Sequence, residues 1–204
     1  VTFSAIKEKN AGLILLSGAN YGDVGGAILD EKLDLAKQRI QVWLAIFSDR
    51  FYLELQRTSR PGDEKHVHAA VALAEQFQVP VVATNDVMFH QKEDFDAHET
   101  RVCINQGVTI EDPKRSRSFS EEQYLKSTAQ MKTLFADIPS ALANSVEIAK
   151  RCSATVHLGE YFLPDYPVPD GMTMDEFFRQ LSAKGLDKRL QFILDKGDQQ
   201  YDIK

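Results

Sequence analysis

Carboxylate and histidine side chains gather after an apolar segment in the middle of the chain, and these are the residues that could bind a metal ion. Asp86 comes directly after that segment, His90 lies four residues further on, and an acidic cluster occupies 93–99. A hydrolytic metal site needs several oxygen or nitrogen ligands that converge on one ion. Asp94 and His98 would share a helix face, but a solvated acidic face is the simpler interpretation. We therefore expect Asp86 to be a lone carboxylate.

Other residues of chemically active types lack the partners that their chemistry needs. His66 and His68 would point about 200° apart on a helix, so they cannot reach one ion, and we expect surface histidines. The glycines at 22–26 match neither GxGxxG nor a P-loop, which favours a tight packing turn. Ser17 lies outside any GxSxG context, and His157 stands alone. The sequence therefore predicts no serine hydrolase and no phosphate loop.

Charge and composition restrict the possible partners. The net charge of −6 repels a phosphate backbone at long range, and the short basic group Lys114, Arg115 and Arg117 is expected to be a solvated turn. Apolar residues make up 43% and charged residues 26%, values typical of a globular chain. The chain is therefore expected to fold, but to bind nucleic acid poorly as a whole.

The cysteines and the apolar runs favour a cytoplasmic protein. Cys103 and Cys152 form no CxxC pair, which suits a reducing compartment, and both are expected to be small buried side chains. No run approaches the roughly 20 apolar residues that span a membrane, so we expect no membrane association. Neither end carries a start or stop signal, and we expect both to be cuts in a longer chain.

The elements that must position these residues alternate in the first half of the chain. Strand, helix, strand, helix at this spacing predicts an α/β fold with parallel strands joined by right-handed crossovers. Side chains that do chemistry then gather at the carboxyl ends of the strands. Three such strands close poorly, so we expect further strands from residues upstream. The expected strands are 13–16, 51–55 and 80–84, and the expected helices are 29–47, 63–77 with Asp63 as its N-cap, and 94–106.

The second half is predicted to be helical and to contain a boundary. Ser120 and Gln123 have the spacing of a capping box, which predicts a helix from 120 to about 135, and Pro139 is placed to begin the next. Prolines make 158–171 irregular, and Thr173 is expected to cap a last helix. The irregular stretch is the best candidate for a domain boundary.

Motifs spread in order along the chain resemble the alpha subunits of bacterial DNA polymerase III, the C-family polymerases. The similarity runs nearly end to end and weakens after about residue 170. The motifs are GLILLSG (12–18), GDVG (22–25), FYLELQR (51–57), VVATNDV (81–87), DAHE (96–99), DPKR (112–115), FADIP (135–139), IAKRC (148–152) and LGEYFLP (158–164).

This resemblance implies a fold and a parent reaction. Residues 1–156 would be the latter part of a polymerase-and-histidinol-phosphatase (PHP) domain, a partial, distorted (β/α)7 barrel, and 157–204 would be a Pro-rich connection and the start of the polymerase palm. The parent would be a nucleotidyltransferase that uses DNA, deoxynucleotides and Mg²⁺, with its catalytic aspartates downstream. Its partners would include the proofreading exonuclease (epsilon) subunit and the other polymerase III holoenzyme subunits.

The resemblance also implies that the metal site of the PHP domain has decayed in this chain. Metal-binding members carry a Cys where this sequence has Ala19, and an Asp-x-His where it has Asp86 and Met88. Alanine offers no donor, and a thioether is a poor ligand for hard divalent ions. We expect a metal-free structural or partner-docking domain with no catalytic residue and no cofactor of its own. The alternative is an active metal-dependent phosphoesterase or exonuclease in which His90 or His98 compensates.

Overall fold

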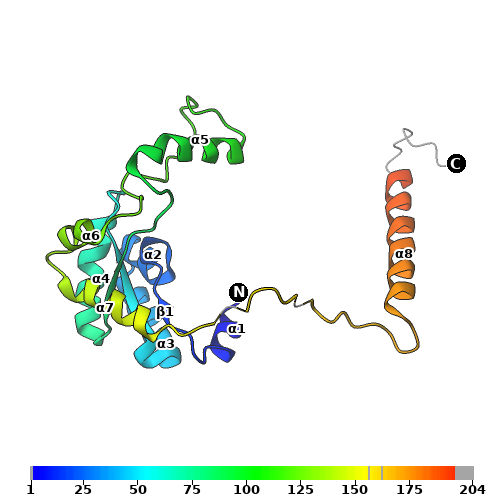
Figure 1. Ribbon diagram of the computed structural model, residues 1–204, viewed down its shortest axis with the longest axis horizontal. Helices are drawn as coiled ribbons and strands as arrows, with labels where there is room; N and C mark the ends of the chain where they lie inside the picture. The colour runs from blue at the N-terminus through cyan, green and yellow to red at the C-terminus, as the bar shows by residue number, and fades with distance from the viewer. Residues whose placement is uncertain (1, 156, 162, 196–204) are drawn as a thin grey trace. The chain divides into compact units, whose positions relative to one another are not determined.

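The computed structural model describes residues 2–155, 157–161 and 163–195 of the chain and divides it into two compact units, Val1–Ala154 and Thr155–Lys204. The first unit contains the sheet and most of the helices (Figure 1). Its helices are α1 (Phe3–Glu8), η1 (Ala19–Tyr21), α2 (Asp23–Leu29), α3 (Leu33–Phe47), η2 (Ser48–Arg50), α4 (Asp63–Phe77), η3 (Lys92–Asp94), α5 (Phe95–Gln106), α6 (Thr128–Leu134) and α7 (Pro139–Arg151).

Three short parallel strands form the sheet, as the sequence predicts. β1 (Leu15–Leu16), β2 (Phe51–Gln56) and β3 (Val81–Thr84) lie in the order β1-β2-β3. β1 is shorter than the expected strand 13–16, and Leu13 is half exposed. The described residues form a mixed α/β fold with a small sheet and do not close into a barrel.

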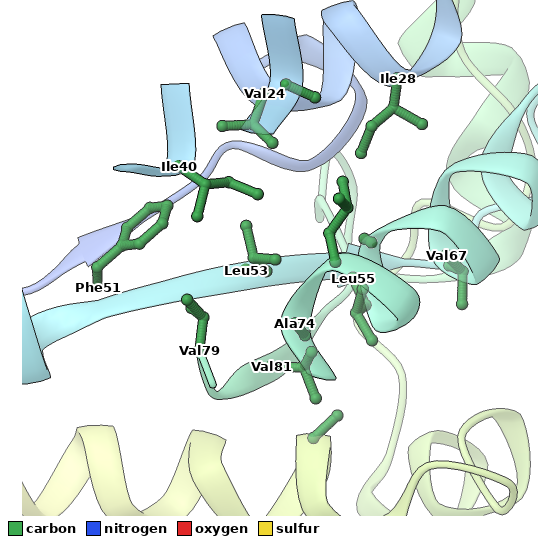
Figure 2. Close-up of a cluster of buried hydrophobic side chains, with 14 of the residues drawn as sticks. Val24, Ile28, Ile40, Phe51, Leu53, Leu55, Val67, Ala74, Val79 and Val81 are labelled. Atoms are coloured by element: carbon green, nitrogen blue, oxygen red, sulfur yellow. The ribbon is translucent and has the colours of Figure 1, made fainter. Parts of the chain in front are cut away.

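The core lies between β2 and the helices packed around it. Figure 2 shows Leu53 of the central strand among Val24 and Ile40 on one side and Val81 on the other. β2 is almost entirely buried along its length, which explains its near-continuous apolar sequence, because a parallel strand covered by helices has little solvated surface. This packing fixes the strand ends, and with them the polar residues that follow each strand.

The helix predicted over 29–47 begins later than expected, at Leu33 as α3, because Leu29 is the last residue of α2 and the chain turns between the two helices. The backbone changes direction between α2 and α3 at Glu31, which has a φ of 63°. The Lys32 N–H donates to the Ala27 carbonyl at 2.9 Å across this turn. The apolar spacing continues across this turn because both helices pack on the same core, so periodicity alone did not reveal the break.

Gly22 and Gly25 serve packing, as predicted, but Gly25 and Gly26 lie inside α2 and not in a turn. A Cβ at Gly22 would lie 1.6 Å from the Ser17 carbonyl oxygen, and one at Gly25 would lie 1.8 Å from the Ala19 carbonyl oxygen. Only hydrogen can occupy these positions, so the two glycines let α2 lie directly against η1.

The helix predicted from Ser120 begins later than expected. Ser120 and Gln123 make only a turn, in which the Ser120 N–H donates to Gln123 Oε1 at 2.9 Å. The helix there is α6, capped by Ser127 with a reciprocal bond from Gln130. The cap predicted at Ser120 is therefore wrong, because the same spacing recurs seven residues on, at Ser127 and Gln130, where the helix begins.

The helix starts predicted at Pro139 and Thr173 agree with the structure. Pro139 opens α7. Thr173 and Glu176 exchange hydrogen bonds at the start of α8 (Met174–Asp195) in the second unit. Phe162 and residues 196–204 of the segment expected to begin the palm lie outside the described residues. None of the described helices has the length and apolarity that crossing a membrane requires.

Candidate functional site

The carboxyl ends of β2 and β3 bring Asp86 into contact with a cation and an amide. Asp86 Oδ2 lies 2.9 Å from Arg60 Nη1 and accepts a hydrogen bond of 2.9 Å from Gln123 Nε2. The Asp86 side chain is 19% exposed and that of Arg60 is 8% exposed, so the pair is largely removed from water. The carboxylate expected to be alone is therefore paired with a guanidinium.

Arg60 is held by groups from three neighbouring segments. Its Nε donates to Thr58 Oγ1 at 2.8 Å, its Nη1 to the Tyr21 hydroxyl at 2.8 Å, and its Nη2 to Gln56 Oε1 at 3.1 Å. Because the planar guanidinium is fixed in several directions, its charge has a defined position beside Asp86. From the sequence Arg60 could only be interpreted as part of a turn, since it precedes Pro61-Gly62.

A second polar network, centred on Glu54, ties the ends of all three strands together. Glu54 Oε2 accepts from the Gly18 N–H at 3.0 Å, and Oε1 accepts from Thr84 Oγ1 at 2.6 Å and Gln56 Nε2 at 3.2 Å. The Glu54 N–H in turn donates to Ser17 Oγ at 2.9 Å. One signal of this network is present in the sequence: polar residues at alternate positions of an apolar strand place Glu54 and Gln56 on one face.

Asp63 organises the loop before α4 instead of capping the helix as predicted. Gly62 is the N-cap, and Asp63 Oδ2 accepts from the Thr58 N–H at 2.7 Å and from the Arg60 N–H at 3.2 Å. Its Oδ1 accepts from Asn20 Nδ2 at 2.6 Å. The Asp63 carboxylate accepts hydrogen bonds from backbone N–H groups, as an N-cap side chain would, but these bonds stabilise the loop that carries Arg60.

Ala19 and Met88, where the resemblance implies metal ligands, offer no oxygen or nitrogen side-chain donor. Ala19 is fully buried in η1, and Met88 is 39% exposed beyond β3. The Met88 N–H donates to the Gln123 carbonyl at 2.8 Å, which places Gln123 next to Asp86. The described residues bring no three His, Cys, Asp or Glu side chains together in a way that could bind a metal ion.

His98 and Glu99 correct the prediction of a solvated acidic face. His98 is 6% exposed and Glu99 4% exposed, and the His98 ring packs between Phe89 and Phe119. Burial lowers the pKa of His98, and the Arg101 charge lowers it further. Glu99 pairs with Arg115, so the prediction that Arg115 belongs to a solvated turn is also wrong. His98 is thus a residue of α5 that packs in an aromatic cluster with Phe89 and Phe119. His90 is exposed.

His66 and Cys152 also differ from expectation. His66 is only 1% exposed and lies beneath α2, where its Nε2 would be 3.1 Å from a Cβ at Gly25. Burial lowers its pKa, and the nearby Asp63 charge opposes that effect. His68 is exposed as predicted. Cys103 is buried as expected, whereas Cys152, at the end of α7, is exposed.

Comparison with known proteins gives matches along nearly the whole chain. The PHP domain family matches residues 1–58. The DNA polymerase III subunit alpha of Pseudomonas aeruginosa is 53% identical over 98% of this chain and 17% of its own length. The proteins of the same name from Escherichia coli K12 and Pasteurella multocida are 52% and 44% identical over 91% and 92% of this chain. The chain spans about a sixth of the length of these curated relatives, 16% in the latter two.

Proposed function

We propose, on the premise that this chain is related over nearly its whole length to the DNA polymerase III alpha subunits, that it is a segment of a replicative DNA polymerase. The parent reaction would be template-directed transfer of a deoxynucleotide to a primer end, assisted by two Mg²⁺ ions. The Mg²⁺ ligands would lie in the longer protein, and this segment would supply PHP-domain structure and no catalytic residue.

The pairing of Asp86 with Arg60 is the observation that carries the metal-free part of this proposal. A guanidinium 2.9 Å from the carboxylate oxygen already compensates its charge in a poorly solvated place. A divalent cation at the same oxygen would meet that positive charge at short range, where charges repel strongly. Ala19 and Met88 provide no donor to offset the repulsion, so the residues present do not fit a bound metal ion.

The fold proposal follows from the free edges of the sheet. β1 and β3 each have a single neighbour, and an unpaired edge of a parallel sheet needs cover or a further strand. We propose that residues outside this chain add strands and complete the distorted barrel implied by the PHP family. Residues 157–204 would then connect this domain to the palm.

The partners of the longer protein are proposed on the same basis. An alpha subunit would bind DNA and deoxynucleotides and would assemble with other holoenzyme subunits in the cytoplasm. A proofreading exonuclease subunit would use the PHP domain as a platform. Loss of the metal ligands supports such a docking role, because a domain that keeps its fold without its chemistry has another use for its surface.

Metal analysis of the full-length protein tests the metal-free assignment. After dialysis against Mn²⁺ and then buffer, we expect the wild type and an Asp86→Ala variant to retain the same amount of metal. The two proteins should also hydrolyse phosphodiesters at equal rates with added Mn²⁺. One equivalent of metal that is lost in the Asp86→Ala variant, or hydrolysis that depends on Asp86, would support the active phosphoesterase and reject this proposal.

A further inference from the structure

The chain makes a tight turn between Pro169 and Met172, directly before α8. The Met172 N–H donates to the Pro169 carbonyl at 3.2 Å, and Asp170 and Gly171 occupy the two central positions. Gly171 has a φ of 83°, which the third position of a type II turn requires and which glycine adopts without strain. At no other place in the sequence does an aspartate or an asparagine precede a glycine.

The Asp170 side chain is free to approach the backbone beside it. Asp170 is exposed, and its carboxyl group forms no hydrogen bond or ion pair with any residue that the structure describes. The carboxylates of Asp63 and Asp86, in contrast, are each fixed by several partners. Asp170 can therefore turn its carboxyl group toward the next peptide bond.

The backbone nitrogen of Gly171 is open to that carboxyl group. Its N–H forms no hydrogen bond within the described part of the chain. Glycine has no Cβ to shield the nitrogen, and the space where a Cβ would lie is empty. An aspartate carboxyl group and the nitrogen of the next residue can close a five-membered ring, and the proximity of the two groups favours such an intramolecular reaction.

We propose that Asp170-Gly171 is a site of backbone modification, at which Asp170 isomerises to isoaspartate. The Gly171 nitrogen attacks Cγ of the protonated Asp170 carboxyl group, so that a C–N bond forms, a C–O bond breaks and water leaves with the nitrogen's proton. The product is a cyclic succinimide. Water then adds to the main-chain carbonyl carbon of Asp170, and cleavage of its bond to nitrogen leaves the main chain running through Cγ. The two steps release and consume one water, need no other reactant, and are independent of the polymerase reaction.

The modification would weaken the start of α8. An isoaspartyl linkage lengthens the main chain by one carbon–carbon bond, about 1.5 Å, and this separates the Met172 N–H from the Pro169 carbonyl. Thr173 follows at once and caps α8, where its Oγ1 accepts from the Glu176 N–H at 3.3 Å. The first turn of α8 should therefore open more readily in the isoaspartate form.

Ageing of the full-length protein at neutral pH and physiological temperature tests this site. The tryptic peptide 152–179 contains Asp165, Asp170 and Asp175, and electron-transfer fragmentation distinguishes isoaspartate from aspartate at each of them. We expect isoaspartate to accumulate at Asp170 and to stay at the unaged level at Asp165. Asp165 is a matched control because it is also exposed and outside any helix or strand, but it precedes a tyrosine. Hydrogen exchange in the first turn of α8 should rise as the isoaspartate accumulates.

Two substitutions at one position separate this reaction from general ageing of the stretch. Asp170→Asn should form the same succinimide faster, with release of ammonia, and should yield isoaspartate sooner than the wild type. Asp170→Glu keeps the charge, but its longer side chain would have to close a six-membered ring, so the isomerised product should be lost. The proposal is overturned if the aged wild type contains no isoaspartate at Asp170, or if Asp165 and Asp170 isomerise equally. Hydrogen exchange that stays unchanged in the isoaspartate form would overturn the effect on α8.

Discussion

At the scale of single residues, Asp86 acts as the counter-ion of a buried arginine. Asp86→Asn keeps the shape and tolerates the φ of 43° at this position, so it removes the charge alone. We expect it to lower the free energy of unfolding by about 2 kcal/mol, because Arg60 then remains buried without a full counter-charge. Urea unfolding monitored by circular dichroism measures the difference.

The matched control for Asp86→Asn is the same change in an exposed ion pair. Glu147 pairs with Lys150, and their side chains are 57% and 66% exposed. Such pairs contribute little to stability, so Glu147→Gln should unfold at nearly the wild-type urea concentration. Equal urea unfolding midpoints for the wild type and Asp86→Asn would show that the Asp86–Arg60 contact does not contribute to stability.

His66 should make stability depend on pH in the range where histidine titrates. Because burial lowers its pKa in the folded protein, the unfolded chain binds a proton more readily as the pH falls through about 6.5. Unfolding is therefore favoured at lower pH, with full stability above that range. His98 acts in the same direction.

Comparison of two neighbouring histidines isolates this effect. Between pH 7.5 and 5.5 we expect the wild type to lose about 1 kcal/mol of unfolding free energy through His66. His66→Gln should show a correspondingly smaller loss, whereas His68→Gln, at an exposed position, should follow the wild type. The same pH dependence in all three proteins would contradict the burial of His66.

At the scale of elements, the contact between α2 and η1 depends on Gly25. Gly25→Ala would place a methyl group 1.8 Å from the Ala19 carbonyl oxygen, and backbone must move to relieve that clash. We expect a loss of about 3 kcal/mol. The adjacent Gly26 also lies in α2 but has open space around it, so Gly26→Ala should raise stability by about 0.5 kcal/mol.

Thermal unfolding of these two variants tests the packing of α2. The melting temperature should fall in Gly25→Ala and rise slightly in Gly26→Ala. Because both substitutions add the same methyl group to the same helix, helix propensity cannot account for opposite signs. If Gly25→Ala were as stable as Gly26→Ala, the close approach of α2 to η1 would be wrong.

At the scale of the whole molecule, the chain should be cut first in the irregular stretch near the start of its second unit, Thr155–Lys204. Tyr161 is 94% exposed and Leu163 85% exposed, and both lie outside any helix or strand. Within the first unit, Phe51 and Tyr52 are buried. Brief digestion with chymotrypsin should therefore release a fragment that ends at 161 or 162, because the bonds after Leu163 and Tyr166 precede prolines; mass spectrometry identifies the fragment.

A variant without the first cleavage site serves as the control for this digestion. Replacing Tyr161 and Phe162 together by serine should move the earliest cut to Leu158, which is 86% exposed, because Leu163 and Tyr166 are followed by prolines and resist chymotrypsin. First cuts inside 1–154 would contradict the division of the chain into these two units.

The sequence by itself determined the parallel α/β order, the three strands and the packing role of Gly22 and Gly25. These follow from local apolar patterns and from residue types, which act over a few neighbours. The sequence did not determine where this helix begins, since Ser120 and Ser127 carry the same capping signal and only Ser127 caps the helix in the folded chain.

Only the tertiary structure decided what surrounds each polar side chain. Arg60 and Asp86 are 26 residues apart in sequence, yet they meet because parallel strands end at the same edge of the sheet. Gln123 joins them because its carbonyl accepts a hydrogen bond from the Met88 N–H. The burial of His66, His98 and Arg115 likewise depends on helices and loops that arrive from elsewhere in the chain. A residue's type shows what it can do, but the partners that set its charge and exposure come from contacts that are distant in sequence.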